Sequence, residues 1–455
     1  MVSRGTVGFH IRRVNADPRS GVVQLHYGFG DEGSGDEEFI ERIELSPRPS
    51  AEDSERFQSA ARLLLLVAGT SYYKSQAPHT VIVEVETTKP ERDLVEALYD
   101  HGLREFAYTN GLAIPLISRF VWAGEETEPA PGVDDYDDHE IGRPLVPFGG
   151  GKDSTVVLSM LDEADPVTVN PTSTHRAVAD VLGHELIEIH RGVDRIDELT
   201  RNDRFNGHIP ITAIVSAICL MAAVRDGYTS VVLANEEAAS EPTLISDHPA
   251  SAGRAINHQW SKGATFEALF DRAVASRAIG VRYFSWLRSV DEADIVRLLS
   301  CQPDALGLLV SCNRAFAGRT TGSAQEAPQR WCGECPKCLF TFLMLATRLG
   351  PAEMVNIFGH DLLDLPERVD GFRQLWSETK PLECVGERTD AANALLTLAT
   401  DPRWAEHRVV TELRSSAEAA HALGRWEQLG ADDAKLRPRP APEVFQRRLT
   451  EALSP

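Results

Sequence analysis

The chain has 455 residues and a formal net charge of −22. Such an acidic protein lacks the basic surface that displaces counterions from DNA or RNA, so nucleic acid is not expected as a partner. There is no run of about 20 apolar residues and no signal-like N-terminus, which predicts a cytoplasmic protein that does not enter a membrane.

The first 140 residues mix strand and helix patterns. Alternating apolar and polar side chains predict the strands, and apolar residues spaced three to four apart predict the helices. The predicted elements are strands at 5–14, 21–29 and 79–86 and helices at 57–68 and 91–101, with a surface loop, GDEGSGDEE, at 30–38. An acidic stretch with proline and glycine, GEETEPAPGVDDYDDHE, predicts a linker at 124–140. We therefore expect an N-terminal α+β domain at 1–140, a candidate for substrate binding.

Strands and helices alternate regularly after the linker. The predicted strands are 143–148, 165–170, 184–190 and 229–235, and the predicted helices are 153–161, 174–182 and 209–227. Short apolar strands separated by helices predict an α/β fold at 141–345, with a parallel sheet and helices on both faces. The remaining residues, 346–455, have mostly helical patterns and predict a helical C-terminal region.

A glycine-rich loop joins the first of these strands to the first helix. Its glycines precede the lysine, unlike the common P-loop GxxxxGK followed by Ser or Thr, and it also lacks GxGxxG. Glycines let backbone N–H groups approach an anion, and the helix adds its positive end. Asp153 beside a phosphate suggests a Mg²⁺ ligand, whereas the plainer alternative is a turn with Asp153 as helix N-cap. The predicted nucleotide-binding residues are Phe148, Gly149, Gly150, Gly151, Lys152, Asp153 and Ser154.

Polar residues also follow two other predicted strands. Asn170 ends PVTVN, at a position that can contact adenine, and Asn235, Glu236 and Glu237 follow VVLA, where they can carry or orient a metal ion. The alternative for the acidic residues is a solvated loop.

Three cysteines are packed into WCGECPKC. Cys332, Cys335 and Cys338 have a spacing that lets their thiolates converge on one tetrahedral Zn²⁺, with Cys312 as the expected fourth ligand. Such a closed site is structural, and the alternatives are a redox role or an iron–sulfur cluster.

The strand, FGGGKDS and helix together resemble the PP-loop of the ATP pyrophosphatase superfamily. Further segments resemble the MurL family of UDP-N-acetylmuramoyl-L-alanyl-L-glutamate epimerases along nearly the whole chain: LANEEAAS, INHQWSK, SCNRAF, WCGECPKCLF and KPLECVG. The resemblance implies a Rossmann-like PP-loop fold, ATP and Mg²⁺ as cofactors, and a small UDP-muramoyl dipeptide as substrate. It also implies that the terminal L-Glu is inverted to D-Glu with release of AMP and pyrophosphate, a step in making peptidoglycan precursors.

An epimerase of this kind needs groups that move a proton at the glutamate α-carbon. His258, Lys262 and Cys384 are the main candidates, with His175 and His208 behind them, although any one of these histidines could be a surface or core residue. Cys384 lies in a polar segment away from the other cysteines and could serve if its pKa is lowered; otherwise it is an inert buried thiol. The candidates for holding the carboxylates or diphosphate of the substrate are Arg314, Lys380 and Arg388.

Two other kinds of protein could carry the same loop. One is another PP-loop adenylating enzyme, such as a 7-cyano-7-deazaguanine synthase-like or tRNA-thiolating enzyme, the latter being disfavoured by the acidic composition. The other is a non-enzymatic nucleotide-binding module, which would need neither Asp153 nor proton-transfer groups. None of these patterns specifies the oligomeric state.

Overall fold

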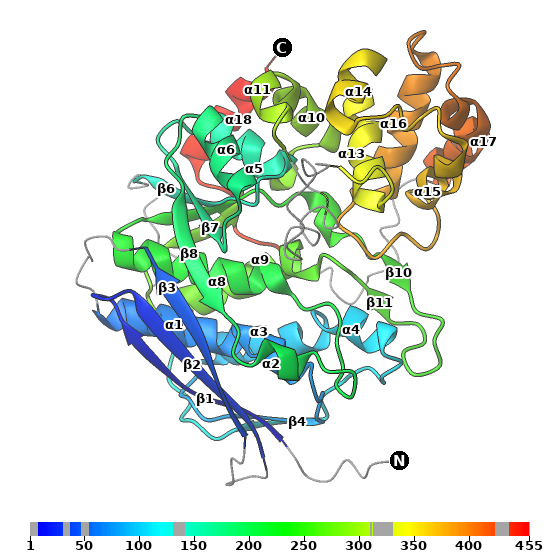
Figure 1. The fold of residues 1–455 in the computed structure, drawn as a ribbon. Coiled ribbons are helices and arrows are strands. Elements are labelled where there is room, and N and C mark those ends of the chain that lie inside the picture. The colour runs from blue at the N-terminus through cyan, green and yellow to red at the C-terminus, as the bar shows by residue number, and fades with distance from the viewer. Residues whose placement is uncertain are drawn as a thin grey trace.

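The computed structural model describes residues 8–30, 37–46, 54–130, 142–309, 312, 331–423 and 436–454. These residues form a mixed α/β protein built on one ten-stranded sheet, with a helical region at its C-terminal end (Figure 1). The strand order is β12-β9-β6-β7-β8-β3-β2-β1-β4-β5. Six of the nine neighbouring pairs are parallel and three are antiparallel.

Five neighbouring strands form an entirely parallel half of the sheet. They are β6 (Pro144–Pro147), β7 (Asp165–Val169), β8 (Ile187–Gly192), β9 (Ser230–Leu233) and β12 (Arg282–Ser285). In chain order their arrangement is 3-2-1-4-5, so the direction of winding reverses between β6 and β9. Ligands in such sheets bind at that reversal, beyond the carboxyl ends of the strands.

Helices cover both faces of this parallel half, as the sequence predicts (Figure 1). The helices are α5 (Lys152–Ser159) and α6 (Ser173–Val181) on one face and α8 (Ile211–Asp226) and α9 (Ala264–Ser276) on the other. Leu145 and Val231 point into one core with α8 and α9, whereas Val146 and Val232 point into a second core with α5. Because successive side chains of a strand face opposite sides, strands buried on both faces must be apolar throughout.

The other half of the sheet comes from the N-terminal part of the chain. Its strands are β1 (Gly8–Asp17), β2 (Val22–Gly30), β3 (Glu37–Leu45), β4 (Thr80–Val83) and β5 (Arg119–Trp122). Its helices are α1 (Ser54–Ala68), α2 (Thr70–Tyr73), α3 (Lys89–Asp100) and α4 (Arg104–Thr109). β3 overlaps a segment for which the sequence predicts only a loop at 30–38.

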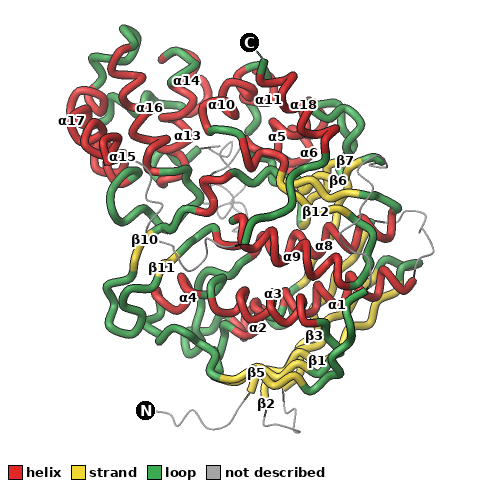
Figure 2. Tube along the Cα trace, turned by 180° about the vertical axis from the view of Figure 1, so that it is seen from behind, coloured by secondary structure: helices red, strands yellow, loops and turns green. Residues whose placement is uncertain are grey.

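The two halves join where β3 pairs antiparallel with β8, with Leu45 opposite Ile189. An ion pair between the fully buried Glu41 and the largely buried Arg191 reinforces this junction, because Arg191 Nε lies 2.8 Å from Glu41 Oε1. Helix α1 also packs on α8, and seen from behind (Figure 2) α1, α3, α8 and α9 lie together in the middle of the molecule. The predicted linker is described only at 124–130, and whether 1–140 folds as a separate unit stays a prediction.

The described residues after β12 are mostly helical, which from 346 onward is as predicted. Their helices of at least six residues are α10 (Glu292–Ser300), α13 (Pro336–Ala346), α14 (Pro351–Phe358), α15 (Val369–Gln374), α16 (Arg388–Thr400), α17 (Arg408–Leu423) and α18 (Glu443–Leu453). α18 packs back against the parallel sheet, where Phe445 contacts Phe284 and Trp286. No helix in the described ranges is long and apolar enough to cross a bilayer.

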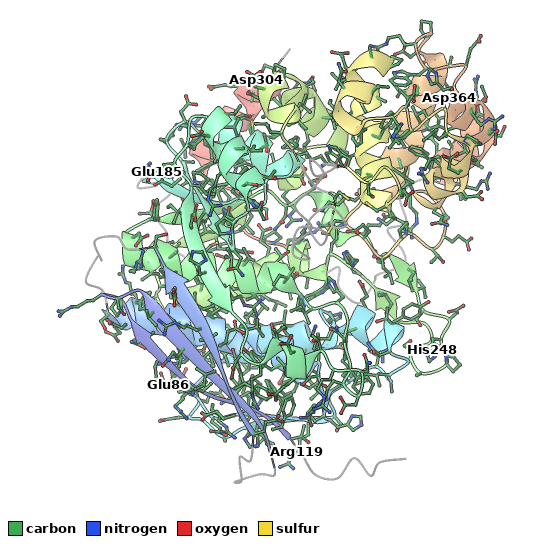
Figure 3. All side chains as sticks on the ribbon, viewed as in Figure 1. Glu86, Arg119, Glu185, His248, Asp304 and Asp364 are labelled. Carbon is green, nitrogen blue, oxygen red and sulfur yellow. The ribbon has the colours of Figure 1, made fainter. Side chains whose placement is uncertain are left out.

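Acidic side chains are spread around the outside of the molecule. Glu185, Asp304 and Asp364 are exposed examples from three different regions (Figure 3). This distribution accords with the net charge of −22 and with the expectation that a polyanion is not the partner.

Candidate active site

The glycine-rich loop leads from the end of β6 into α5, as predicted. Gly150 has a φ of +67°, and a Cβ there would lie 3.2 Å from His175 Cδ2, so a side chain is disfavoured. The N-cap of α5 is Gly151, and the alternative that Asp153 caps the helix is therefore wrong. The turn places the N-terminus of α5 at a cavity, where its unpaired backbone N–H groups favour an anion.

Lys152 lies among three carboxylates at the start of α5. Its Nζ is 2.9 Å from Glu236 Oε1 and 2.8 Å from Glu292 Oε2, and it also contacts Asp153. Burial alone would lower the pKa of Lys152, but the three carboxylates raise it well above the usual value. Burial and the neighbouring Glu236 raise the pKa of Asp153 to about 6, and burial and Glu292 raise that of Glu236 to about 7.

This carboxylate cluster fits a divalent cation. Three carboxylates face one ammonium, so they carry excess negative charge when all are ionised, as the raised pKa values of Asp153 and Glu236 reflect. Glu292 Oε1 is buried and has no hydrogen-bond partner among the described residues, which leaves an oxygen lone pair for a ligand. Carboxylate oxygens are the donors that Mg²⁺ prefers.

A cavity of about 390 Å³ opens beside the loop, at the reversal between β6 and β9. It extends from the glycine loop to the segment after α15 that contains Cys384. The predicted residues that line it are Phe148, Gly149, Gly151, Lys152, Asp153, Ser154, Asn235, Glu236, Lys262 and Cys384. One cavity therefore joins the predicted nucleotide loop to two predicted proton-transfer residues.

Cys384 lies among cationic side chains at the far end of this cavity. Lys262 Nζ is 3.4 Å from its Sγ, and a ring nitrogen of His258 lies within 4.8 Å of the sulfur. Burial alone would raise the pKa of Cys384, but Lys262 and His258 lower it to about 6. Conversely, burial would lower the pKa of His258, but Cys384 and Glu105 raise it to about 9. At neutral pH this pair is a thiolate and an imidazolium.

The segment that carries Cys384 is held by buried charges. Lys380 Nζ lies 2.6 Å from Glu241 Oε2, and Arg388 Nη1 lies 2.9 Å from Glu241 Oε1. Arg388 also donates hydrogen bonds to four backbone carbonyls, those of Ser377, Pro242, Thr243 and Glu378. These contacts occupy the two basic groups expected to hold the substrate's carboxylates or diphosphate, and the structure instead shows them fixing the cysteine segment in place.

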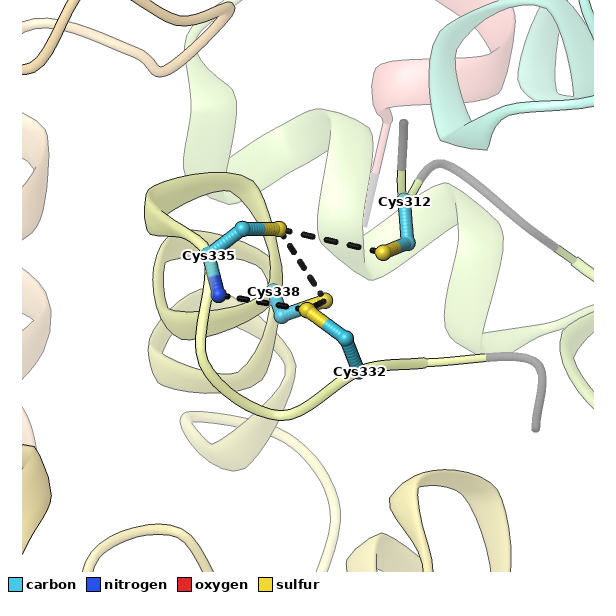
Figure 4. A group of neighbouring side chains, drawn as sticks. All are labelled: Cys312, Cys332, Cys335 and Cys338. Carbon is cyan, nitrogen blue, oxygen red and sulfur yellow. Dashed lines mark hydrogen bonds between the residues drawn. The ribbon is translucent and has the colours of Figure 1, made fainter. Parts of the chain in front are cut away.

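The four predicted cysteines come together beside the N-terminus of α13 (Figure 4). The Sγ atoms of Cys312 and Cys335 are 3.8 Å apart, those of Cys335 and Cys338 3.4 Å, and those of Cys332 and Cys338 3.6 Å. Four ligands about 2.3 Å from Zn²⁺ at tetrahedral corners would be about 3.8 Å apart. The positive φ of Gly333, +65°, turns the chain between the first two cysteines. The arrangement fits a four-thiolate metal site.

Other predicted residues lie elsewhere. Asn170 ends β7 as expected, but its amide pairs with the backbone N–H and carbonyl of Arg191 and it does not line the cavity. His175 borders the cavity, and its Nδ1 accepts a hydrogen bond from Thr172 N as part of the cap of α6. Arg314 lies outside the described residues.

Sequence reasoning missed two carboxylates that the site contains. Glu292 begins α10 and reaches Lys152 from 140 residues along the chain, and Glu105, on α4 of the N-terminal half, lies 2.7 Å from His258. Both are buried acids in ordinary helical patterns, and no local motif distinguishes them. Only the fold brings them to the site.

These features define a class: an α/β protein whose site lies beyond the carboxyl ends of a parallel sheet, with a glycine loop, a carboxylate cluster and a thiolate in one cavity. Comparisons with known proteins give the family. Residues 2–286 match the MurL N-terminal domain and residues 308–426 match the MurL C-terminal domain. The chain belongs to the MurL family.

Curated relatives agree with this assignment. A protein of Micromonospora sp. is 38% identical over 392 residues (83% of this chain, 84% of the relative), and one of Salinispora tropica is 38% identical over 393 residues (83% and 82%). One of Xanthomonas oryzae pv. oryzae is 36% identical over 417 residues (88% of each). All three are named UDP-N-acetyl-alpha-D-muramoyl-L-alanyl-L-glutamate epimerase.

Proposed function

We propose that this protein inverts the terminal L-Glu of UDP-N-acetylmuramoyl-L-Ala-L-Glu to D-Glu, using ATP and releasing AMP and pyrophosphate. The observation that carries the proposal is the single cavity that joins the glycine loop to Cys384 and Lys262. The three relatives are named for this epimerase activity, and this chain matches them over 82–88% of their length. The parallel sheet, the loop and the site at the reversal support assignment to the PP-loop ATP pyrophosphatases.

Activation is needed because the α-proton beside a carboxylate is very weakly acidic: its removal would create a dianion. Converting the carboxylate to a mixed anhydride with AMP expels pyrophosphate, removes that negative charge and makes an enolate accessible. After the α-proton is removed, an acid returns a proton to the opposite face, and water cleaves the anhydride to release AMP and the D-Glu carboxylate. The backbone of the glycine loop and the N-terminus of α5 bind the phosphates. Asp153, Glu236 and Glu292 would hold Mg²⁺, which would neutralise phosphate charge.

Cys384 is the best-placed group to take the α-proton. Its thiolate is present at neutral pH because Lys262 and His258 outweigh the effect of burial on its pKa. A base must be unprotonated in order to act, and its pKa is best placed near the working pH. The Lys262 ammonium, 3.4 Å from the sulfur, is placed to stabilise negative charge as the enolate forms.

The test is an assay with purified protein, ATP, Mg²⁺ and the L-Ala-L-Glu substrate in ²H₂O. We expect pyrophosphate release, D-Glu on chiral analysis after hydrolysis, and deuterium at the glutamate α-carbon. Absence of both pyrophosphate and D-Glu would refute the proposal. ATP binding without turnover would indicate the non-enzymatic module instead, and pyrophosphate release with tRNA or a deazaguanine precursor would indicate another PP-loop enzyme.

Asp153→Asn should fold normally and fail to release pyrophosphate, because it loses a carboxylate from the proposed cation site. An Asp153→Asn protein that releases pyrophosphate at the parent rate would remove that residue from the mechanism. Asp162→Asn, in the loop after α5, is a matched control because this exposed acid does not line the cavity.

A further inference from the structure

One carboxylate of the N-terminal half contacts His258, which lies beside the cavity residue Cys384. Glu105 lies on α4, and its Oε2 is 2.7 Å from His258 Nδ1. The side chains of Glu105 and His258 are only 9% and 13% exposed, so water weakens this interaction little. Helix α4 packs against β11 (Ala255–Ile256), which leads directly into the loop that carries His258.

His258 connects this carboxylate to Cys384. A ring nitrogen of His258 lies within 4.8 Å of Cys384 Sγ, and the imidazolium helps to lower the pKa of the thiol. The result is a buried chain of carboxylate, imidazole and thiol. In such chains the third group orients the histidine and stabilises its positive charge, and the histidine activates the thiol.

The other charged groups around the pair are identifiable. Lys262 and Lys337 also lower the pKa of Cys384, and the Glu383 carboxylate lies beside both Cys384 and His258. The imidazole ring of His208 also contacts that of His258, with the two ring centroids 4.4 Å apart.

Burial and the positive charge of His258 lower the pKa of His208 to about 4. His208 is therefore neutral at physiological pH and leaves the proton on His258. Among the described carboxylates near His258, Glu105 is the one with a hydrogen bond to the ring, because its Oε2 lies 2.7 Å from His258 Nδ1.

We propose that Glu105 is a positioning residue: it fixes the ring of His258, keeps that ring protonated, and so holds Cys384 as a thiolate. The role of that thiolate in catalysis rests on the proposed function, but the charge state of the thiol does not. An N-terminal element thereby sets the reactivity of a cysteine that comes from the C-terminal region.

A metal ion bound by Glu105, His208 and His258 is the main alternative, because ligand atoms of all three lie within 4.8 Å of one another. Two ligand atoms about 2.0 Å from a tetrahedral ion are about 3.3 Å apart. The observed 2.7 Å between Glu105 and His258 is the length of a charged hydrogen bond instead. The geometry favours the hydrogen bond.

The experiment measures the charge state of Cys384 directly. The rate of its alkylation by iodoacetamide is followed from pH 5 to 10 by peptide mass spectrometry, without substrate. In the parent protein the midpoint should lie near the pKa of about 6. In Glu105→Gln, which keeps the size but loses the charge, the midpoint should rise by about one unit or more. At pH 6 the alkylation rate should then fall about fivefold or more, because the thiolate fraction falls by that factor.

Two further variants show that Glu105 acts through His258. His258→Gln should raise the midpoint as well, and adding Glu105→Gln to it should produce little further rise, because the two residues work as one unit. Asp100→Asn is the control: this carboxylate pairs with Arg104 on the same helix as Glu105 and should leave the midpoint unchanged.

The proposal is overturned if folded Glu105→Gln, checked by circular dichroism, alkylates with the parent midpoint. If Glu105→Gln does not fold, a parent midpoint in His258→Gln overturns it equally. It is also overturned if elemental analysis finds a metal ion beyond the cysteine cluster that Glu105→Gln loses. The alkylation experiment contains no substrate, so its outcome does not depend on the epimerase assay. The positioning role of Glu105 can therefore fail while the proposed function stands, and the proposed function can fail while the positioning role stands.

Discussion

Replacing Glu236 by Gln is expected to raise the stability of the protein without Mg²⁺ while abolishing its activity. Glu236 is 14% exposed and shares Lys152 with two other carboxylates. Gln keeps the shape and can still accept a hydrogen bond from Lys152, but it carries no charge. The variant should therefore lose repulsion within the cluster, and at the same time lose a ligand for the proposed cation.

The pKa shift sets the size of the effect. Burial and Glu292 raise the pKa of Glu236 from 4.5 to about 7, which corresponds to about 3 kcal/mol against the ionised carboxylate in the folded protein. A carboxyl group whose pKa is raised by folding does not lower the free energy of unfolding below pH 4.5, its pKa in the unfolded chain. It lowers that free energy most above pH 7, near its pKa of about 7 in the folded protein. The metal-free Glu236→Gln protein should therefore match the parent near pH 4.5 and exceed it by about 1–3 kcal/mol at pH 8.

Thermal unfolding with and without Mg²⁺ and ATP measures both effects. At pH 8 without ligands the variant should melt about 1–5 °C above the parent. With ligands at a hundredfold excess over Kd the parent should gain about 2.7 kcal/mol and the variant much less. Pyrophosphate release by the variant should be lost.

The neighbouring Glu237 provides the matched control. The sequence predicts Glu237 beside Glu236 at the metal, but its carboxylate pairs with Arg437 at 2.9 Å and lies outside the cluster around Lys152. Glu237→Gln should show neither the pH-dependent gain nor the loss of ligand stabilisation. The reasoning fails if metal-free Glu236→Gln is less stable than the parent at pH 8, or if Mg²⁺ and ATP stabilise both proteins equally.

Three other substitutions test separate parts of the structure. Cys335→Ser should reduce zinc content and lower the unfolding temperature, since metal binding and folding are coupled, and a full zinc equivalent by elemental analysis would contradict the four-thiolate site. Glu41→Gln leaves the buried charge of Arg191 without its partner and should lower the free energy of unfolding in urea by about 3–5 kcal/mol. Glu44→Gln, at an exposed neighbouring position, is the control, and an equal loss in both variants would mean that the Glu41–Arg191 pair does not hold β3 to β8. Cys384→Ser should release pyrophosphate without incorporating deuterium at the glutamate α-carbon, and normal incorporation would exclude the thiolate as base.

Four of the five strands in the parallel half were predictable because their signals are local, whereas β12 was not predicted. The runs around β6, β7 and β9 are apolar and short, and α8 is apolar on every side and ends at Gly227 in a left-handed conformation. β3 was missed although it alternates, because its acidic start resembles a surface loop and the inward position 41 is a glutamate. That glutamate is explained only by Arg191, which comes from a strand 150 residues away.

The site shows the same division. The glycine loop and the cysteine cluster were predicted because each is specified by neighbours in the chain, with Cys312 as the one distant member. Lys262 and Cys384 were predicted as candidates, but their contact at 3.4 Å depends on tertiary packing. Lys380 was misassigned because a sequence shows that a residue is basic without showing that a buried glutamate already neutralises it.

The position of Cys384 gives a physical reason for the long helical region after the sheet. A thiol on the sheet itself would be set beside the carboxylates around Lys152, and like charges would raise its pKa. Cys384 instead lies on a segment fixed by Lys380, Arg388 and Glu241, where the cationic Lys262 and His258 are its neighbours. The cavity thus has an end rich in carboxylates suited to a cation and phosphates, and an end where a thiolate is stable. A reaction that first activates a carboxyl group and then removes the neighbouring proton needs those two environments side by side, and Lys262, whose charge interacts with Asp153 and Glu236 as well as with Cys384, links them.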